Sequence, residues 1–151
     1  MDFTIIQPAS IKDLQTITDF NQAMALETED KQLDADTLAK GVRAILEDSN
    51  KGRYYMARVN GKAAGQMLIT REYSDWRDGW FWWIQSVYVA PEHRRKGLYT
   101  SLYRHVYSIA AKEQDVCGLR LYVDKDNAKA QQTYSALGME LARYDMFEVE
   151  F

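Results

Sequence analysis

The sequence contains few residues that build covalent or metal-linked frameworks. Its 151 residues include one cysteine, Cys117, and two histidines. One cysteine cannot form an internal disulfide, and this set is too small for a typical structural metal site. We therefore expect no disulfide and no metal, and we expect Cys117, at the turn into a strand, to be a buried or half-buried structural thiol.

Long apolar runs and an excess of positive charge are also missing. The longest strongly apolar run covers residues 80–84, far short of the roughly 20 residues that a transmembrane helix needs. No signal sequence opens the chain, so we expect a cytoplasmic protein without a membrane span. A formal net charge of −3 argues against a protein that coats nucleic acid.

The remaining composition is that of one globular domain. Apolar residues make up 46% of the chain and charged residues 27%, and no repeat, low-complexity run or linker interrupts it. The length is enough to bury a core. We expect a single domain over residues 1–151.

Helix and strand signals alternate along the chain. Ser10 and Asp13 form a capping box ahead of a first helix, and Asp34 or Asp36 caps a second. The Asn60-Gly61 pair lies between two strand-like runs and predicts a hairpin.

The second half of the chain continues this alternation. Pro91 ends an aromatic strand, Gly97 precedes a helix, and a strand is expected over residues 118–124. Gly138 ends the next helix, and alternation over residues 146–151 predicts a last strand. The expected order is β-α-α-β-β-β-α-β-α-β, an α/β fold with a mixed sheet and helices on its faces.

A basic triplet stands where the aromatic strand gives way to a helix. Arg94, Arg95 and Lys96 precede Gly97 in "VAPEHRRKGLYTSLYRHV". A helix N-terminus has unpaired N–H groups and a partial positive charge, so this turn fits a pyrophosphate group. A solvated basic turn is the alternative.

Two segments carry a resemblance to a known family. This stretch and "LYVDKDNAKAQQTYSALGM" resemble the GNAT superfamily of acetyl-CoA-dependent N-acetyltransferases. The family's pyrophosphate motif, Gln/Arg-x-x-Gly-x-Gly/Ala, aligns with residues 94–99, where Tyr99 replaces the usual small residue. The second segment aligns its asparagine, tyrosine and glycine with Asn127, Tyr134 and Gly138.

The resemblance implies a fold and a cofactor. The implied fold is a mostly antiparallel central sheet that splays between two parallel strands, flanked by helices. Acetyl-CoA or CoA is expected to lie in the splay, with its pantetheine arm paired to the first strand and its pyrophosphate on the next helix. The residues expected to bind it are Val87, Tyr88, Val89, Arg94, Arg95, Lys96, Gly97, Leu98, Tyr99, Thr100 and Asn127.

The resemblance also places the chemistry. Tyr134 falls at the general-acid position that protonates the departing thiolate, although a core tyrosine is the alternative. Deprotonating a primary amine at pH 7 costs about 4.6 kcal/mol, so a base is needed. Gln85 stands where relatives carry a glutamate, which leaves Glu72, Asp75 and Glu29 as candidate bases, of which we select Glu72.

The acceptor is expected to be a small amine. The acidic segment "LETEDK", which includes Glu29, lies in the region that caps the acceptor site in the family. Trp83 and Gln85 are the other expected substrate contacts, since an aromatic face suits a cation. Together with "REYSDW" this is loosely similar to the diamine acetyltransferase branch. An acidic loop that is only solvated and aromatics that only fill the core are the alternatives.

The expected function is direct acetyl transfer from acetyl-CoA to a primary amine of a small molecule, such as a polyamine, an amino acid or an antibiotic. The alternatives are a non-catalytic acyl-CoA sensor or interaction module, and an acetyltransferase acting on protein lysines or N-termini. A homodimer formed through the last strand is a further expectation, because such an edge strand is able to pair.

Overall fold

The computed structural model describes residues 2–151. The chain divides into two compact units, one ending at Leu121 and the other covering Tyr122–Phe151. None of the helices among the described residues is long and apolar enough to cross a membrane.

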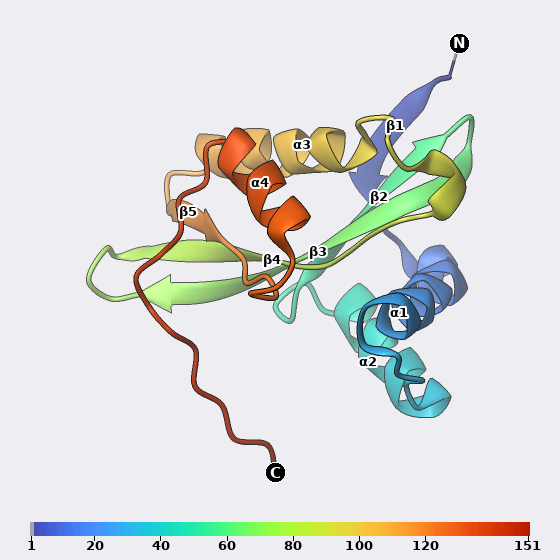
Figure 1. Ribbon diagram of the computed structural model, residues 1–151, viewed down its shortest axis with the longest axis horizontal. Helices are drawn as coiled ribbons and strands as arrows, with labels where there is room; N and C mark the ends of the chain where they lie inside the picture. Colours follow the sequence, from blue (N-terminus) through green and yellow to red (C-terminus); the bar gives the residue numbers. More distant parts are fainter. Residues whose placement is uncertain (1) are drawn as a thin grey trace. The chain divides into compact units, whose positions relative to one another are not determined.

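The first unit is built on a five-stranded sheet in the order β1-β2-β3-β4-β5 (Figure 1). The first three pairs of neighbours are antiparallel, and β4 and β5 are parallel. This is the mixed, mostly antiparallel sheet that we expected. The strands are β1 (Thr4–Pro8), β2 (Arg53–Val59), β3 (Lys62–Ser74), β4 (Gly79–Val89) and β5 (Val116–Arg120).

Helices cover both faces of this sheet. Helices α1 (Leu14–Glu29) and α2 (Ala35–Glu47) lie on one face, and α3 (Leu98–Lys112) lies on the other (Figure 1). A short 3-10 helix, η1 (Ile11–Asp13), precedes α1. Another, η2 (Pro91–His93), lies between β4 and the loop that leads into α3.

The local signals in the sequence set the element boundaries. Ser10 and Asp13 form the capping box, and the side chain of Asp34 caps α2 by accepting from the Thr37 N–H at 2.9 Å. Asn60 and Gly61 join β2 to β3 with φ values of +51° and +83°. Both are positive, as a type I′ hairpin turn requires. These predictions are confirmed.

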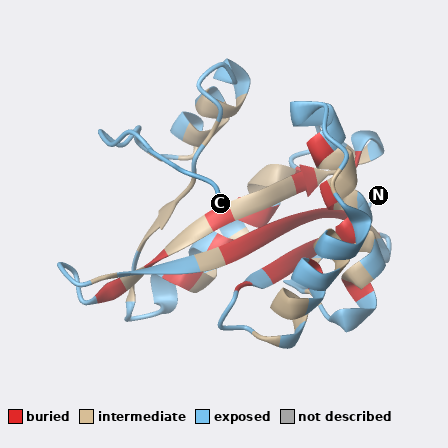
Figure 2. Cartoon of the chain, turned by 90° about the horizontal axis from the view of Figure 1, so that it is seen from below, coloured by how far each residue is buried: buried red, intermediate tan, exposed pale blue. Residues whose placement is uncertain are grey.

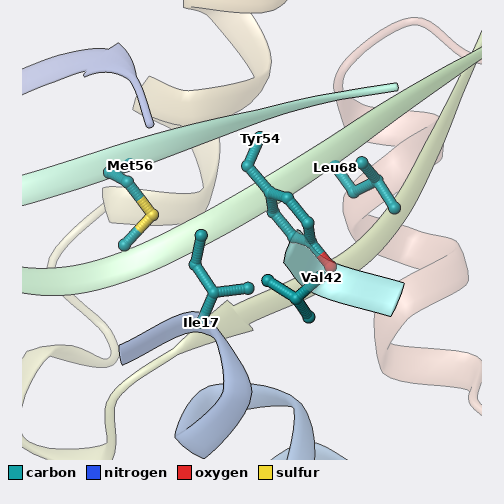
Figure 3. Packing of buried hydrophobic residues seen from close by; sticks show 5 residues of the cluster. All are labelled: Ile17, Val42, Tyr54, Met56 and Leu68. Carbon is teal, nitrogen blue, oxygen red and sulfur yellow. The ribbon is translucent and has the colours of Figure 1, made fainter. Parts of the chain in front are cut away.

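The core beneath α1 and α2 is a compact apolar cluster of Ile17, Val42, Tyr54, Met56 and Leu68 (Figure 3). Buried residues gather in the central strands (Figure 2). Burial of each such side chain contributes about 1.5–3 kcal/mol. This packing holds α1 against β2 and β3, which sets one wall of the site described below.

The second unit contains α4 (Ala128–Ala136). The Asn127 side chain caps it by accepting from the Ala130 N–H at 3.1 Å, and Gly138 follows it with a φ of +92°. The predicted last strand is wrong: residues 139–151 have no regular secondary structure. Phe147 and Val149 are 95% and 78% exposed. Alternation makes a strand only where a partner strand satisfies its backbone groups, and the described sheet ends at β5.

Two smaller predictions also differ from the structure. The strand expected over residues 118–124 is β5, which begins earlier and ends at Arg120. Cys117 is exposed rather than buried. The inward position of this strand is held by its neighbour Gly118, which packs so closely on Phe81 that an added Cβ would lie 2.8 Å from the Phe81 ring. Successive residues of a strand face opposite sides, so the tight packing at Gly118 directs Cys117 outward.

Candidate active site

The sheet opens along the second half of β4. The pairing of β4 with β5 ends at Trp83 opposite Arg120, whereas β4 continues to Val89. On this side, the backbone groups of residues 85–89 have no strand partner in the described sheet. An exposed strand edge of this kind can pair with an extended ligand that carries amides.

A bulge marks the point where β4 changes. The register between β3 and β4 shifts between Gln66 and Leu68, and Ser86 has a left-handed φ of +48°. Left-handed backbone costs a non-glycine residue roughly 1–2 kcal/mol. The surrounding structure must therefore hold Ser86 in place.

A buried polar network supplies that support. Nε2 of Gln66 donates to the Ser86 carbonyl at 3.1 Å and to Oδ1 of Asn21 at 3.3 Å. Nδ2 of Asn21 donates to the Tyr54 hydroxyl at 3.2 Å. Gln66 is 0% exposed and Asn21 4%, so these bonds are shielded from water and tie α1, β2 and β3 to the bulge.

Two features of this network concern protons. Burial raises the pKa of Tyr54 above 10.0, although its hydrogen bonds with Asn21 and Ser86 oppose the shift. The phenol is therefore neutral at pH 7 and serves as a hydrogen-bonding group rather than a base.

Oε1 of Gln66 is buried and has no partner among residues 2–151, so the network retains one acceptor for a further donor.

The loop between β4 and α3 contains two residues with left-handed backbone. Arg95 and Gly97 have φ values of +63° and +77°. Gly97 is the N-cap of α3, and no side chain caps the helix. The first N–H groups of α3 therefore have no intrahelical acceptor, and they carry the positive end of the helix dipole. This arrangement fits a phosphate group.

The three basic side chains of the loop have different environments. Arg94 pairs with Glu27 of α1 at 2.8 Å, and its Nε donates to the Val89 carbonyl at 2.8 Å. Arg94 therefore fastens the loop to α1 and β4. Arg95 and Lys96 are exposed and belong to none of the ion pairs found among residues 2–151. Their charges are available to an anion at the helix terminus.

A polar strip lies on the α1 and α2 face of β3 and β4. Oε1 of Glu72 accepts from Nε1 of Trp83 at 3.1 Å and from Arg120 at 3.0 Å. Gln85 donates to the Thr70 hydroxyl at 2.6 Å. Oε2 of Glu72 has no hydrogen bond with any described residue. The strip thus presents one carboxylate oxygen with a fixed orientation.

The structure brings together some of the predicted site residues. Val87, Tyr88 and Val89 form the open edge of β4, and residues 94–100 form the loop and the first turn of α3. Glu72, Trp83 and Gln85 share the polar strip, and Glu29 is the exposed last residue of α1.

Asn127 and Tyr134 lie in the second unit, at the start and in the body of α4. Oδ1 of Asn127 is used in capping, and Tyr134 is half-buried. The predicted roles of Asn127 in cofactor binding and of Tyr134 as the general acid stay predictions.

Sequence reasoning missed three residues of this region: Gln66, Ser86 and Arg120. Gln66 and Ser86 interrupt the otherwise apolar runs "AAGQMLI" and "WWIQSVYV". A polar residue at a core position must find hydrogen-bond partners, so these interruptions were a usable signal. Arg120 gave no comparable signal, because its role depends on a partner 48 positions away, Glu72.

Comparison with known proteins agrees with this geometry. The sequence model of the acetyltransferase (GNAT) family matches residues 14–139. A possible acetyltransferase from Clostridium difficile 630 is 46% identical, with 98% of this chain and 97% of that chain covered and a TM-score of 0.93. The chain belongs to the GNAT acetyltransferase family, as the sequence motifs predicted.

More distant structures share the fold. A predicted acetyltransferase from Clostridium acetobutylicum, described with acetyl-CoA, is 16% identical over 98% of this chain and 96% of that chain, with a TM-score of 0.78. An aminoglycoside N-acetyltransferase in complex with CoA is 15% identical over 99% and 96% of the two chains, with a TM-score of 0.79. No curated protein matches the chain.

Proposed function

We propose that this acetyltransferase moves an acetyl group from acetyl-CoA directly to a primary amine of a small cationic molecule. The observation that carries the proposal is the uncapped N-terminus of α3 at the end of a β4 edge that β5 leaves open. One part of this arrangement suits a pyrophosphate and the other an extended chain of amides, and both groups occur in coenzyme A.

The residues of the loop fit the cofactor. The N–H groups of residues 98–100, together with the charges of Arg95 and Lys96, would hold the pyrophosphate. The edge of residues 87–89 would bind the pantetheine arm. Bound acetyl-CoA would supply an activated thioester.

Glu72 is the proposed acceptor of the amine proton. Its Oε1 is held by Trp83 and Arg120, which leaves Oε2 for the acceptor's ammonium or for a water between them. A positioned base of this kind contributes about 10²–10⁴-fold to the rate. Tyr134 is the proposed acid for the departing thiolate.

Negative charge favours a cationic acceptor. Glu72 lies on the strip, and Glu29 and Asp30 end α1, whose last turn contains no basic residue. The Trp83 ring adds an aromatic surface beside Glu72, which favours a cation. A polyamine, an amino acid or an antibiotic with a second cationic group meets these requirements better than an acidic or neutral amine.

The proposal includes a cytoplasmic location and a homodimer. The thiol of Cys117 is exposed and forms no disulfide, which suits a reducing compartment.

Residues 146–151 alternate apolar and acidic side chains and are exposed, so they are available to pair with a second copy. Light scattering at working concentration should give twice the mass of 17.5 kDa, and a purely monomeric protein would contradict the dimer.

Calorimetric titration with acetyl-CoA, followed by a thiol-release assay over polyamines, amino acids, aminoglycosides and lysine peptides, tests the function. We expect binding, and release with cationic small amines. Absence of binding refutes the cofactor site, and binding without release on any amine indicates an acyl-CoA sensor. Release only with peptides indicates a protein acetyltransferase.

A matched pair of variants tests the acid. Tyr134→Phe should lower turnover while leaving acetyl-CoA affinity unchanged. Tyr144→Phe, at an exposed position of the same unit, should change neither. An unchanged turnover in Tyr134→Phe would remove this residue from the mechanism.

A further inference from the structure

A cavity lies away from the open edge of β4. It has a volume of about 350 Å³ and is lined entirely by residues of the first unit. Its lining includes two arginines, two tryptophans and two carboxylates: Arg53, Arg71, Trp80, Trp82, Glu113 and Asp115. Its size is at the small end of the range for ligand sites.

The cavity is separated from the acetyl-transfer site by the length of α3 and by the sheet. Glu113 is the C-cap of α3, whereas the pyrophosphate loop stands at its N-terminus. A helix of 15 residues is about 22 Å long. Trp80 and Trp82 face the opposite side of β4 from Trp83, because successive strand residues alternate between faces. A ligand in the cavity therefore does not touch the proposed cofactor loop.

Two arginines form the basic side of the cavity. Arg53 pairs across strands with Ile69, and Arg71 lies two residues further along β3. Diagonal neighbours of this kind lie about 7–8 Å apart. Both side chains are exposed and belong to none of the ion pairs found in the described part of the chain.

Two carboxylates form the opposite side. Glu113 and Asp115 lie beyond the end of α3, and the Asp115 carbonyl accepts from the backbone N–H of Trp80 at 2.7 Å. Arg71 is on β3, and Asp115 directly precedes β5. Two strand spacings, or about 10 Å, therefore separate the backbones that carry the opposite charges. The charges do not pair across this gap within residues 2–151.

Two indoles form the floor between the charges. Trp80 and Trp82 project from adjacent positions on the same face of β4, next to Arg71. The Arg71 guanidinium lies over the Trp80 ring, 4.8 Å from its centre, and this cation–π contact holds the arginine beside the floor. An aromatic floor favours a planar or apolar ligand body.

We propose that this cavity binds a small zwitterion with a carboxylate and an ammonium at opposite ends of a flat or apolar body. The carboxylate contacts Arg53 and Arg71, the body lies on Trp80 and Trp82, and the ammonium contacts Glu113 and Asp115. Polyphosphates are disfavoured by the two carboxylates and polyamines by the two arginines, since like charges in one site repel. The proposal is independent of acetyl transfer, because no residue of the two sites is shared.

Calorimetric titration of the full chain with 4-(aminomethyl)benzoate tests the proposal. Benzoate and benzylamine each keep one end of this probe, and we expect each to bind roughly tenfold or more weakly, because a charge-assisted hydrogen bond is lost. Equal affinity for the probe and either half would overturn the zwitterion, and no heat up to about 10 mM would overturn the site.

Charge variants place the probe in the cavity. Arg71→Gln and Glu113→Gln should each weaken binding of the probe roughly tenfold, whereas Arg43→Gln, on the exposed surface of α2, should leave it unchanged. Both substituted positions are exposed, so the fold should persist, and thermal unfolding checks this. Probe affinity unchanged in both cavity variants would overturn the proposal.

A titration with saturating CoA separates the cavity from the proposed cofactor site, and the charge variants above separate it from the proposed acceptor site. We expect the same probe affinity with and without CoA, and the same CoA affinity in Arg71→Gln as in the parent chain. Displacement of the probe by CoA would show that the probe occupies the cofactor site and would overturn the proposal. If the chain does not bind CoA at all, the proposed function fails while probe binding still decides this inference.

Discussion

The two halves of β4 have different neighbours. Residues 79–83 are bonded to β3 on one side and to β5 on the other, and they carry three of the four tryptophans. Residues 85–89 are bonded to β3 alone, and the pairing of this half with β3 is interrupted by a bulge. One half is part of the framework, and the other offers a free edge.

The difference between the two halves of β4 shows why the candidate ligand-binding edge lies at residues 85–89. Both halves have strand-forming side chains, so residue type alone does not distinguish them. The distinction comes from the short length of β5, which ends at Arg120, and from the left-handed Ser86. An interrupted ladder leaves unpaired backbone groups, and such groups bind a ligand that offers matching ones.

The largest expected effect concerns the proposed base, Glu72, which lies on β3 opposite Phe81 of the paired half. Glu72→Gln keeps an acceptor for Trp83 and Arg120 but removes the base. We expect turnover to fall about 10²–10⁴-fold, with acetyl-CoA affinity unchanged, as measured by thiol release and by calorimetry. Glu47→Gln, on the exposed face of α2, serves as the control. Full activity of Glu72→Gln would move the base elsewhere.

The next effect concerns the end of the open half. Gly97→Val forces a β-branched residue into φ +77°, which costs at least about 1–2 kcal/mol, and the loop should relax away from the geometry that holds the amides. We expect acetyl-CoA affinity to fall at least roughly tenfold.

Gly61→Val is the matched control, because Gly61 has a φ of +83° and, like Gly97, open space at its Cβ position. It should lower the free energy of unfolding by a similar amount without changing acetyl-CoA affinity. Equal affinity losses in both variants would show that the effect is one of general stability.

The buried support of the bulge gives a smaller effect. Gln66→Leu removes the donor to Ser86 and Asn21, and we expect the free energy of unfolding to fall by about 1–3 kcal/mol. Amide exchange at Val87 and Tyr88 should accelerate, because the bulge loses its anchor. Thr70→Val, which removes the partner of Gln85 in the strip, should leave exchange at these two amides unchanged. Unchanged exchange in Gln66→Leu would separate the network from the bulge.

The smallest effect is a pH dependence. Burial raises the pKa of Tyr54 above 10.0, so the unfolded chain loses this proton first as the pH rises. The stability is therefore full below pH 10 and decreases as the pH rises towards the folded-state pKa. Tyr54→Phe should reduce this slope by up to about 1.4 kcal/mol per pH unit in urea unfolding. An unchanged slope would contradict the assignment to Tyr54.

The sequence predicted the elements whose signals are local. The capping box at Ser10, the turn at Asn60 and Gly61, and the helix start after Gly97 each depend on residues a few positions apart, and each was found where expected. The alternation in residues 146–151 has the same local character, but its strand depends on a partner that local sequence does not name. That prediction was wrong for this reason.

Most of the site's side-chain contacts join distant positions. Arg94 is expected at the phosphate, and the structure adds an ion pair with Glu27, 67 positions away. Glu72 was selected as a candidate base, and the structure adds its contacts with Trp83 and Arg120. Motif spacing shows which residues are present, whereas the packing of α1 and β5 on the sheet decides which of them meet.

The sequence by itself determined the family, the order of the elements and the loop that precedes α3, because these follow from periodicity, caps and a backbone that needs glycine. Only the tertiary structure decided the half of β4 that stays open, the network that holds Ser86, and the charges that face each other across the cavity. These features depend on strand register and on long-range hydrogen bonds, whose free energy exists only when distant segments are packed together.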